Sequence, residues 1–217
     1  MTATLDTTVL VIDDHPLFRK GVADLIGMEP ALRVVGEAAD GLSGLRLAQS
    51  LQPDLILLDL NMKGLDGIET LRRLRADDGL DARIVMLTVS DTEADVVAAL
   101  RAGADGYLLK DMEPEEMLDR LRDATRGRLV ISPQLTELLA RALREATVPV
   151  HPAEAGLTPR EHEILALIAK GHSNKLIARE LDLAVGTIKV HVKHILKKLG
   201  LKTRVEAAVW AINAQQH

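Results

Sequence analysis

Charged side chains stand directly after three of the short apolar runs in this sequence: Asp13 and Asp14 after the first, Asp59 after the third and Lys110 after the fifth. If these runs are strands of a parallel sheet, their carboxyl ends meet at one edge and the four side chains share a crevice. Two carboxylates about 4 Å apart repel each other by roughly 4 kcal/mol at an effective dielectric constant of about 20, so a cation or a function must compensate. Three carboxylates and one ammonium group therefore predict a divalent-metal and phosphoryl site.

The elements that would position these residues alternate regularly up to about residue 127. Apolar runs of strand length lie at 9–12, 34–37, 55–58, 84–88 and 106–109, and helical periodicity lies at 16–28, 41–51, 67–76, 94–102 and 114–126. This alternation predicts an α/β fold with a doubly wound, five-stranded parallel sheet. Two helix starts have local signals: Ser90 and Glu93 have capping-box spacing, and Pro114 is followed by two glutamates.

The composition restricts the chemistry and the class of protein. The 217 residues are 47% hydrophobic, which fits one large or two ordinary domains. Phe18, Tyr107 and Trp210 are the aromatic residues, so the cores must be aliphatic. There is no cysteine, which excludes disulfides, thiolate metal sites and thiol catalysis. No run of 18 apolar residues and no signal-peptide pattern is present, so we expect a cytoplasmic protein without a membrane partner.

The net charge of −5 hides a division along the chain. Residues 1–130 have 15 basic against 24 acidic residues, whereas residues 156–217 have 10 basic against 5 acidic residues. An acidic front and a basic tail suggest that only the tail meets a polyanion. Between them, residues 133–145 predict an amphipathic helix, and residues 147–156, with two prolines and no periodicity, predict a tether. The expected domains are 1–127, a linker at 128–156, and 157–217.

The tail predicts a small all-α domain. Thr158, Pro159 and Glu161 form a helix start with a capping-box pattern, and helical segments follow near 173–180, 184–199 and 203–214. In the segment 184–199, a helical wheel places a core stripe opposite a basic face. The stripe is Ile188, Val192, Ile195 and Leu199, and the basic face is Lys189, Val190, Lys193 and Lys197.

A short helix, a turn and a longer helix with outward lysines are typical of a helix-turn-helix that reads the DNA major groove. The lysines alone would fit a solvated face equally well, but the charge division and the turn spacing favour DNA binding. The segments 157–165, 173–178 and 187–199 resemble the LuxR-type DNA-binding domain. This resemblance implies that Lys189, Val190 and Lys193 reach base edges, with Thr187 and His191 nearer the backbone. Lys197 belongs to the same predicted DNA-binding face.

The same resemblance implies a dimer contact through the last helix, at Val205 and Val209. The sequence departs from the family at Ala184 and Gly186, where a capping residue and a non-glycine residue are usual. Each departure costs about 1 kcal/mol of helix stability. The helix that would enter the groove is therefore expected to start later or to become firm only on DNA.

The first 127 residues resemble a response-regulator receiver domain over their whole length. The matching segments are Asp13 with Asp14, the run 57–62, Thr88, and the run 107–110. The resemblance implies that Asp59 accepts a phosphoryl group from a sensor histidine kinase. It also implies a switch in which Thr88 moves inward and Tyr107 changes its packing, while Lys110 offsets charge on the phosphoryl oxygens.

Mg²⁺ is the expected cofactor, because it is a hard ion that takes oxygen ligands and keeps several waters. Asp14, Asp59 and the Asn61 carbonyl would bind it directly, and Asp13 through water. Lys63 departs from the family, which commonly has proline there, but the adjacent Gly64 still permits an unusual backbone angle. The extra cation is expected to alter the lifetime of the phosphoryl group in a direction that the sequence leaves open.

Both domains and the linker helix resemble nitrate- and nitrite-responsive regulators in particular. The expected function is therefore a response regulator, not an enzyme, that binds promoter DNA as a homodimer when phosphorylated, with RNA polymerase as a further candidate partner. One rival is a Mg²⁺-dependent phosphatase with Asp59 as nucleophile, but such enzymes need a second carboxylate where this chain has Asn61. Another rival is a DNA-binding protein whose receiver domain no longer responds to phosphorylation.

Overall fold

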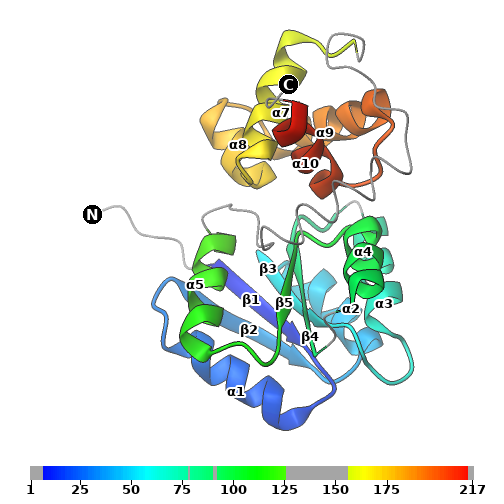
Figure 1. Ribbon diagram of the computed structural model, residues 1–217. Helices are drawn as coiled ribbons and strands as arrows, with labels where there is room; N and C mark the ends of the chain where they lie inside the picture. Colours follow the sequence, from blue (N-terminus) through cyan, green and yellow to red (C-terminus); the bar gives the residue numbers. More distant parts are fainter. Residues whose placement is uncertain (1–6, 78, 90–91, 126–155, 215–217) are drawn as a thin grey trace.

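The computed structural model describes residues 7–77, 79–89, 92–125 and 156–214, which form a sheet-containing domain and a helical domain (Figure 1). All pairs of neighbouring strands in the five-stranded sheet are parallel, and their order is β2-β1-β3-β4-β5. The strands are β1 (Thr7–Ile12), β2 (Leu32–Ala38), β3 (Leu55–Asp59), β4 (Arg83–Thr88) and β5 (Gly106–Leu109). The predicted doubly wound fold is thus confirmed.

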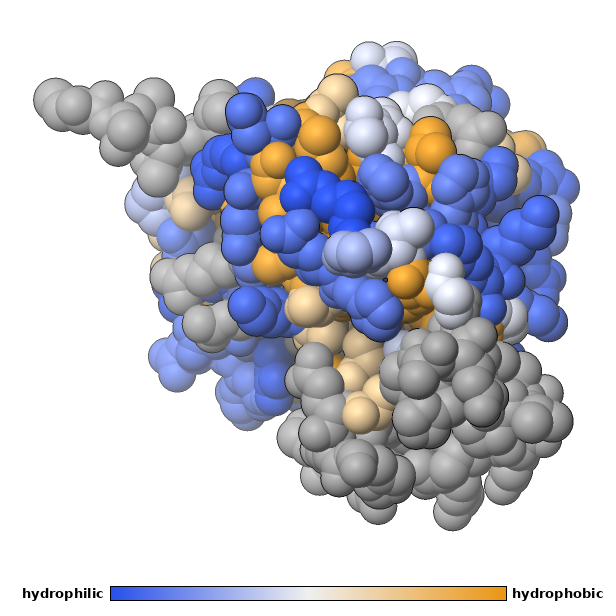
Figure 2. All heavy atoms as spheres, turned by 90° about the horizontal axis from the view of Figure 1, so that it is seen from above, coloured by the Kyte–Doolittle hydropathy of each residue, from blue (hydrophilic) through white to orange (hydrophobic). Residues whose placement is uncertain are grey.

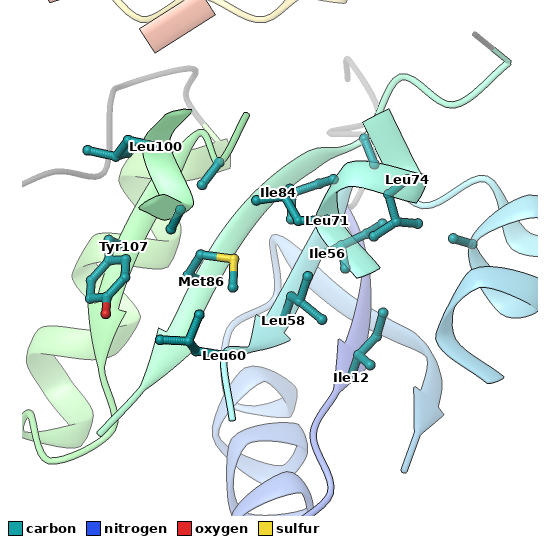
Figure 3. Close-up of a cluster of buried hydrophobic side chains, with 14 of the residues drawn as sticks. Ile12, Ile56, Leu58, Leu60, Leu71, Leu74, Ile84, Met86, Leu100 and Tyr107 are labelled. Carbon is teal, nitrogen blue, oxygen red and sulfur yellow. The ribbon is translucent and has the colours of Figure 1, made fainter. Parts of the chain in front are cut away.

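Five helices cover the two faces of the sheet. They are α1 (Pro16–Gly27), α2 (Gly41–Leu51), α3 (Gly67–Ala76), α4 (Glu93–Ala102) and α5 (Pro114–Thr125). Because successive strand residues point to opposite faces, Val9 and Val11 pack under α1 and α5, whereas Leu10 and Ile12 pack under α2 and α3. Figure 3 shows the second core, in which Ile12, Leu58 and Met86 of three strands face the helices of that layer.

The helical domain consists of α7 (Pro159–Ala169), α8 (Asn174–Glu180), α9 (Val185–Leu199) and α10 (Arg204–Ala214). Its own core includes Ile164, Ile177, Ile188 and Ile195, all with no more than 1% exposure. The predicted cap is confirmed: Thr158 and Glu161 form a reciprocal capping box. Seen from the end that carries this domain, hydrophilic side chains surround a smaller area of hydrophobic ones (Figure 2).

Two local expectations need correction. Helix α4 begins at Glu93, and its N-cap is Thr92, which accepts a hydrogen bond from the Asp95 backbone N–H, instead of the capping box predicted from Ser90. Helix α9 begins at Val185 and includes Gly186, although Ala184 provides no side-chain cap, so its start is not delayed. The predicted helix at 133–145 lies outside the described residues. None of the described helices is long and apolar enough to cross a membrane.

Candidate functional site

The acidic residues predicted from the strand ends do come together at one edge of the sheet. Asp13 and Asp14 follow β1, and Asp59 is the last residue of β3. One ligand atom from each of these residues and one from His15 lie within 4.8 Å of one another, an arrangement that could hold a metal ion. The start of α3 lies close to the backbone of Asp59. A Cβ on Gly67 would lie only 2.2 Å from the Asp59 carbonyl oxygen. Only glycine fits there.

Lys110 closes the cluster from the end of β5. Its Nζ lies 2.7 Å from Oδ2 of Asp13 and 2.8 Å from Oδ2 of Asp59, and its side chain is only 8% exposed. The ammonium group also lies 4.8 Å from the centre of the Phe18 ring, a favourable cation–π distance. Lys110 is therefore the cation that holds two buried carboxylates side by side.

The carboxylates keep unused capacity to bind a cation. Oδ2 of Asp13, Oδ1 of Asp14 and Oδ2 of Asp59 are buried and accept no hydrogen bond of good geometry within the described residues, although the first and third lie against the Lys110 ammonium. Burial raises the pKa of Asp59 and the charge of Asp13 adds to this, while Lys110 acts in the opposite direction. Buried oxygens of this kind fit a hard divalent ion such as Mg²⁺.

Sequence reasoning did not assign a role to His15, whose Nδ1 lies 2.9 Å from Oδ1 of Asp14 and 3.9 Å from Oδ2 of Asp59. Its position next to two aspartates was the available signal.

The residues that follow β3 contribute backbone groups to the site. Asn61 is exposed, and its backbone N–H donates a hydrogen bond of 3.2 Å to Oδ1 of Asp59. The backbone N–H of Lys63 donates to Oδ2 of Asp14, and Gly64 has the left-handed φ of 81° that its position allowed.

The two predicted switch residues lie on strands β4 and β5. Thr88 is the last residue of β4 and is fully buried. Tyr107 lies on β5 with 4% exposure, inside the core that also contains Leu100 of α4 (Figure 3). The ring of Tyr107 is thus packed inward, under the helix that connects β4 and β5.

The helical domain contacts the opposite edge of the sheet, where the strands begin (Figure 1). Lys175 of α8 forms an ion pair with Asp54, which directly precedes β3. Asn174 donates a hydrogen bond of 3.0 Å to Oδ1 of Asp81, and Lys189 of α9 lies 3.9 Å from the same oxygen. Arg83, the first residue of β4, donates to the carbonyl oxygen of Gly171.

The resemblance implied that the unphosphorylated receiver is held against the helix of the predicted DNA-binding face, but sequence reasoning did not identify the residues that make these contacts. Asp54, Asp81 and Asp105 are charged residues shortly before strands, and this position was the only signal available. Burial raises the pKa of Asp54, but hydrogen bonds from Lys175 and Thr8 outweigh it and hold the pKa below its usual value. Asp54 therefore meets Lys175 as a carboxylate.

The predicted DNA-binding residues divide between the two sides of α9. Lys189 turns toward Asp81, and Val192, predicted as core, lines the boundary between the domains. His191 is half-buried. The remaining residues of the predicted face are exposed: Thr187, Val190, Lys193 and Lys197. Val190 is 53% exposed, which is unusual for an apolar side chain in this protein.

The predicted dimer residues are covered. Val205 and Val209 of α10 are 1% and 0% exposed and belong to the same apolar cluster as Val96, Ala99 and Leu100 of α4. This helix therefore packs on the sheet-containing domain, and its apolar face is not available to a second copy in this arrangement.

An apolar groove of about 450 Å³ opens beside Lys110, between α1 and α5. Leu17 and Met28 of this surface are 90% and 75% exposed. The other apolar residues of the groove are Phe18, Val22, Leu25, Met112 and Met117. A continuous apolar surface of this kind is typical of a site that binds another protein.

Comparisons with known proteins match both parts of the chain. The model of the response regulator receiver domain matches residues 9–122, and that of the bacterial regulatory proteins of the luxR family matches residues 155–211. The nitrate/nitrite response regulator protein NarL of Escherichia coli (strain K12) is 57% identical over 94% of this chain and 94% of its own length.

A second relative and a solved structure also extend over almost the whole chain. The nitrate/nitrite response regulator protein NarP of Escherichia coli (strain K12) is 45% identical over 93% of this chain and 92% of its own length. The crystal structure of the response regulator ChrA, from a heme-sensing two-component system, has a TM-score of 0.51 and 32% identity, and covers 98% of this chain and 99% of that chain.

Proposed function

This chain belongs to the family of two-component response regulators in which a receiver domain is joined to a LuxR-type DNA-binding domain, and we propose that phosphorylation of Asp59 controls its binding to promoters of nitrate- and nitrite-responsive genes. The observation that carries this proposal is that the predicted phosphorylation site and the contact with the DNA-binding domain lie at opposite edges of the same sheet. One edge gathers Asp13, Asp59 and Lys110, and the other holds the DNA-binding domain through Lys175. The nitrate signal rests on the similarity to NarL and NarP.

Asp59 is the proposed phosphoacceptor. One of its carboxylate oxygens forms a bond to phosphorus while the bond from phosphorus to the histidine nitrogen of the kinase breaks. Lys110, already 2.8 Å from Asp59, offsets the charge of the phosphoryl oxygens, and the Thr88 hydroxyl donates a hydrogen bond to one of them. Such a reaction needs mainly positioning and charge neutralisation, both of which these residues provide.

Mg²⁺ is the cofactor that the carboxylates fit. Asp14, Asp59 and the Asn61 carbonyl are its proposed direct ligands, with Asp13 acting through water. When bound, the ion neutralises negative charge on the phosphoryl group. Because Asn61 replaces a second catalytic carboxylate, water is poorly activated, and the aspartyl phosphate persists as a signal instead of turning over as in a phosphatase.

The groove between α1 and α5 is the proposed docking site of the sensor histidine kinase. It is continuous with the phosphoacceptor site, because Lys110 both lines the groove and contacts Asp59. A kinase helix seated against Leu17 and Met28 would bury two strongly exposed apolar side chains. The phosphorylated histidine would then lie near Asp59.

The docked arrangement is proposed to be the resting state. The receiver presents the carboxylates of Asp54 and Asp81 to Lys175 and Lys189, so that Lys189 of the predicted DNA-binding face is turned toward the receiver instead of toward DNA. Phosphorylation, with inward movement of Thr88 and repacking of Tyr107, would loosen this contact.

Release would expose two surfaces at once. The DNA-binding face comprises Thr187, Lys189, Val190, His191, Lys193 and Lys197. The dimer contact comprises Val205 and Val209, now buried against α4. Uncovering both would couple dimer formation to binding at paired half-sites, as expected for a helix-turn-helix protein.

The proposed domain boundaries are 1–127 for the receiver, 128–156 for the linker and 157–217 for the DNA-binding domain. The matches of the two family models, at 9–122 and 155–211, support this division.

A promoter-binding regulator must reach the chromosome, so we place the protein in the cytoplasm. RNA polymerase is a further proposed partner at the promoter.

DNA binding by the intact chain tests the proposal. The unphosphorylated protein should bind a nitrate-regulated promoter weakly, and beryllofluoride with Mg²⁺ should strengthen binding and produce dimers. Asp59→Asn should remove the response, whereas Asp119→Asn, at a carboxylate 71% exposed on α5, should keep it. Equal binding with and without beryllofluoride would reject the switch, and steady release of phosphate from small phosphomonoesters would instead indicate a phosphatase.

A further inference from the structure

His15 directly follows the two aspartates at the end of β1 and brings an imidazole nitrogen to the carboxylate cluster. Its Nδ1 lies 2.9 Å from Oδ1 of Asp14, 3.6 Å from Oδ1 of Asp13 and 3.9 Å from Oδ2 of Asp59. One ligand atom from each of these four residues lies within 4.8 Å of the others. The ligands proposed above for Mg²⁺ are all oxygens, so this nitrogen has no part in them.

The main chain of His15 is anchored at the cluster, whereas its ring has no structural task at the start of α1. The backbone N–H donates a hydrogen bond of 2.8 Å to Oδ1 of Asp13. His15 is the N-cap residue of α1, but its side chain makes no capping hydrogen bond and is 69% exposed. A metal ion bound by the ring would therefore break no cap.

The distances from the ring nitrogen fit a single metal ion. Bonds from Zn²⁺ to nitrogen and oxygen are about 2.1 Å long, so neighbouring ligand atoms in a four-coordinate shell lie roughly 3.4 Å apart. The three distances from Nδ1 of His15, 2.9 to 3.9 Å, lie within about half an ångström of this value. Oδ1 of Asp14, the nearest of the three oxygens, is buried and accepts no hydrogen bond of good geometry within the described residues.

Lys110 leaves this side of the cluster open. Its Nζ lies against Oδ2 of Asp13 and Oδ2 of Asp59, whereas the oxygen nearest to His15 is Oδ1 of Asp14. Three ionised carboxylates have a charge of −3, Lys110 supplies +1 and a divalent ion supplies +2, so the charges sum to zero. An ion beside His15 and the ammonium group are thus compatible.

We propose that His15 is a nitrogen ligand that makes this site prefer a borderline divalent ion such as Zn²⁺ over Mg²⁺. Imidazole suits zinc, cobalt and nickel, whereas Mg²⁺ takes oxygen ligands and gives up its waters reluctantly. The inference rests on the proposed function, in which the carboxylates of Asp14 and Asp59 hold a divalent ion. The two ions would compete for these carboxylates, and His15 would determine which of them the receiver holds when both are present.

Displacement of Mn²⁺ from the intact, unphosphorylated chain tests the preference at this site. Mn²⁺ takes the same oxygen ligands as Mg²⁺, and electron paramagnetic resonance detects the released ion. Zn²⁺ and Mg²⁺ are titrated separately, with free Zn²⁺ fixed by a metal-ion buffer so that binding to other histidines does not change it. The ratio of the two concentrations that release half of the Mn²⁺ measures the preference and does not depend on the affinity for Mn²⁺.

His15→Ala should require at least about tenfold more free Zn²⁺, because one ligand is lost, while the required Mg²⁺ should change by less than about twofold. The replaced side chain is exposed and makes no cap, so the variant should fold, and circular dichroism checks this. His162→Ala, at an exposed histidine on α7, is the matched control and should change neither value. Asp14→Asn should weaken the binding of both ions, because they share that carboxylate.

Nuclear magnetic resonance distinguishes a ligand from a nearby charge. In the unmodified chain, Zn²⁺ should shift the ¹⁵N resonance of His15 Nδ1, and Mg²⁺ should not. An unchanged Nδ1 resonance, an unchanged ratio in His15→Ala, or an equal weakening of both ions in that variant would each overturn the proposal. The response to beryllofluoride, measured with Mg²⁺ and without Zn²⁺, tests the proposed function separately, so the two failures are distinguishable.

Discussion

Asp54 and Asp59 lie at the two ends of the same strand: Asp54 directly precedes β3 and forms an ion pair with Lys175 of the DNA-binding domain, whereas Asp59 ends β3 beside Lys110. Strand β4 has the same arrangement, with Arg83 bound to Gly171 at its start and Thr88 buried at its end. Five residue steps of a strand span roughly 16 Å. Two rigid strands thus connect the phosphoacceptor edge directly to the domain boundary.

This connection predicts the behaviour of Asp54→Asn. The substitution removes the charge that pairs with Lys175 but leaves one oxygen to accept the hydrogen bonds from Thr8. Because Lys175 is 58% exposed, the pair contributes at most about 1 kcal/mol, so we expect the unphosphorylated variant to bind promoter DNA roughly two- to fivefold more tightly. Fluorescence anisotropy with labelled promoter DNA measures the change.

The same variant should take up beryllofluoride at Asp59 as the unmodified chain does, because its substitution lies at the far end of β3. Asp24→Asn, which removes a 64% exposed carboxylate on α1, is the matched control and should leave resting DNA affinity unchanged. If Asp54→Asn also left it unchanged, the pair with Lys175 would have no part in holding the resting state.

The glycine in helix α9 gives a second prediction. A Cβ on Gly186 would meet nothing within 4 Å, and its backbone is helical, so Gly186→Ala should stabilise the DNA-binding domain by about 0.5–1 kcal/mol. Gly200→Ala should act in the opposite direction, because Gly200 caps α9 with a φ of 66°. Urea denaturation followed by the fluorescence of Trp210, the single tryptophan, reports on this domain. Equal effects of the two substitutions would contradict the argument.

The sequence predicted the features that depend on local pattern or on the geometry of parallel strands. Apolar runs located all five strands, and the rule that strand ends converge correctly predicted that Asp13, Asp59 and Lys110 lie together. The capping box at Thr158 was equally clear, because it needs only neighbours within one turn. At Ser90 several polar residues compete within one turn, and the cap falls on Thr92.

The residues that contact each other between the two domains could not be predicted in this way. Asn174 meets Asp81 across 93 residues, and Lys175 meets Asp54 across 121 residues, with no periodicity that relates them. Likewise, the apolar pattern of α10 shows that Val205 must be covered, but not that helix α4 of the receiver covers it. Such contacts follow from how two independent cores dock, which depends on surface shape and charge.

A third prediction concerns acid stability of the DNA-binding domain. Burial acts to raise the pKa of Glu161, but hydrogen bonds from Lys198 and Thr158 lower it from 4.5 to about 2. A depressed pKa means that this carboxylate contributes stability above about pH 4.5 and loses that contribution as the pH falls toward 2. Glu161→Gln should therefore be less stable than the unmodified chain at pH 6, and the difference should shrink between these values.

Trp210 fluorescence during urea denaturation at several pH values measures that difference, because Trp210 lies on α10 of the DNA-binding domain. Glu163→Gln, at a neighbouring carboxylate that is 51% exposed, is the control and should show little change in the same range. A difference between Glu161→Gln and the unmodified chain that stayed constant down to pH 2 would show that the carboxylate is not held ionised by Lys198.

The last prediction concerns Lys110, which is the only described cation within 3 Å of both Asp13 and Asp59. Lys110→Ala would leave two carboxylates, 1% and 2% exposed, facing each other without compensation. We expect a loss of roughly 3 kcal/mol in the free energy of unfolding in the presence of EDTA. Mg²⁺ should restore much of it, because the ion supplies the missing positive charge, and should stabilise this variant more than the unmodified chain. Lys20→Ala, at a 70% exposed side chain, should show no such dependence on Mg²⁺. Chemical denaturation followed by far-ultraviolet circular dichroism, with and without Mg²⁺, measures these differences, and an equal loss under both conditions would argue against a cation site at these carboxylates.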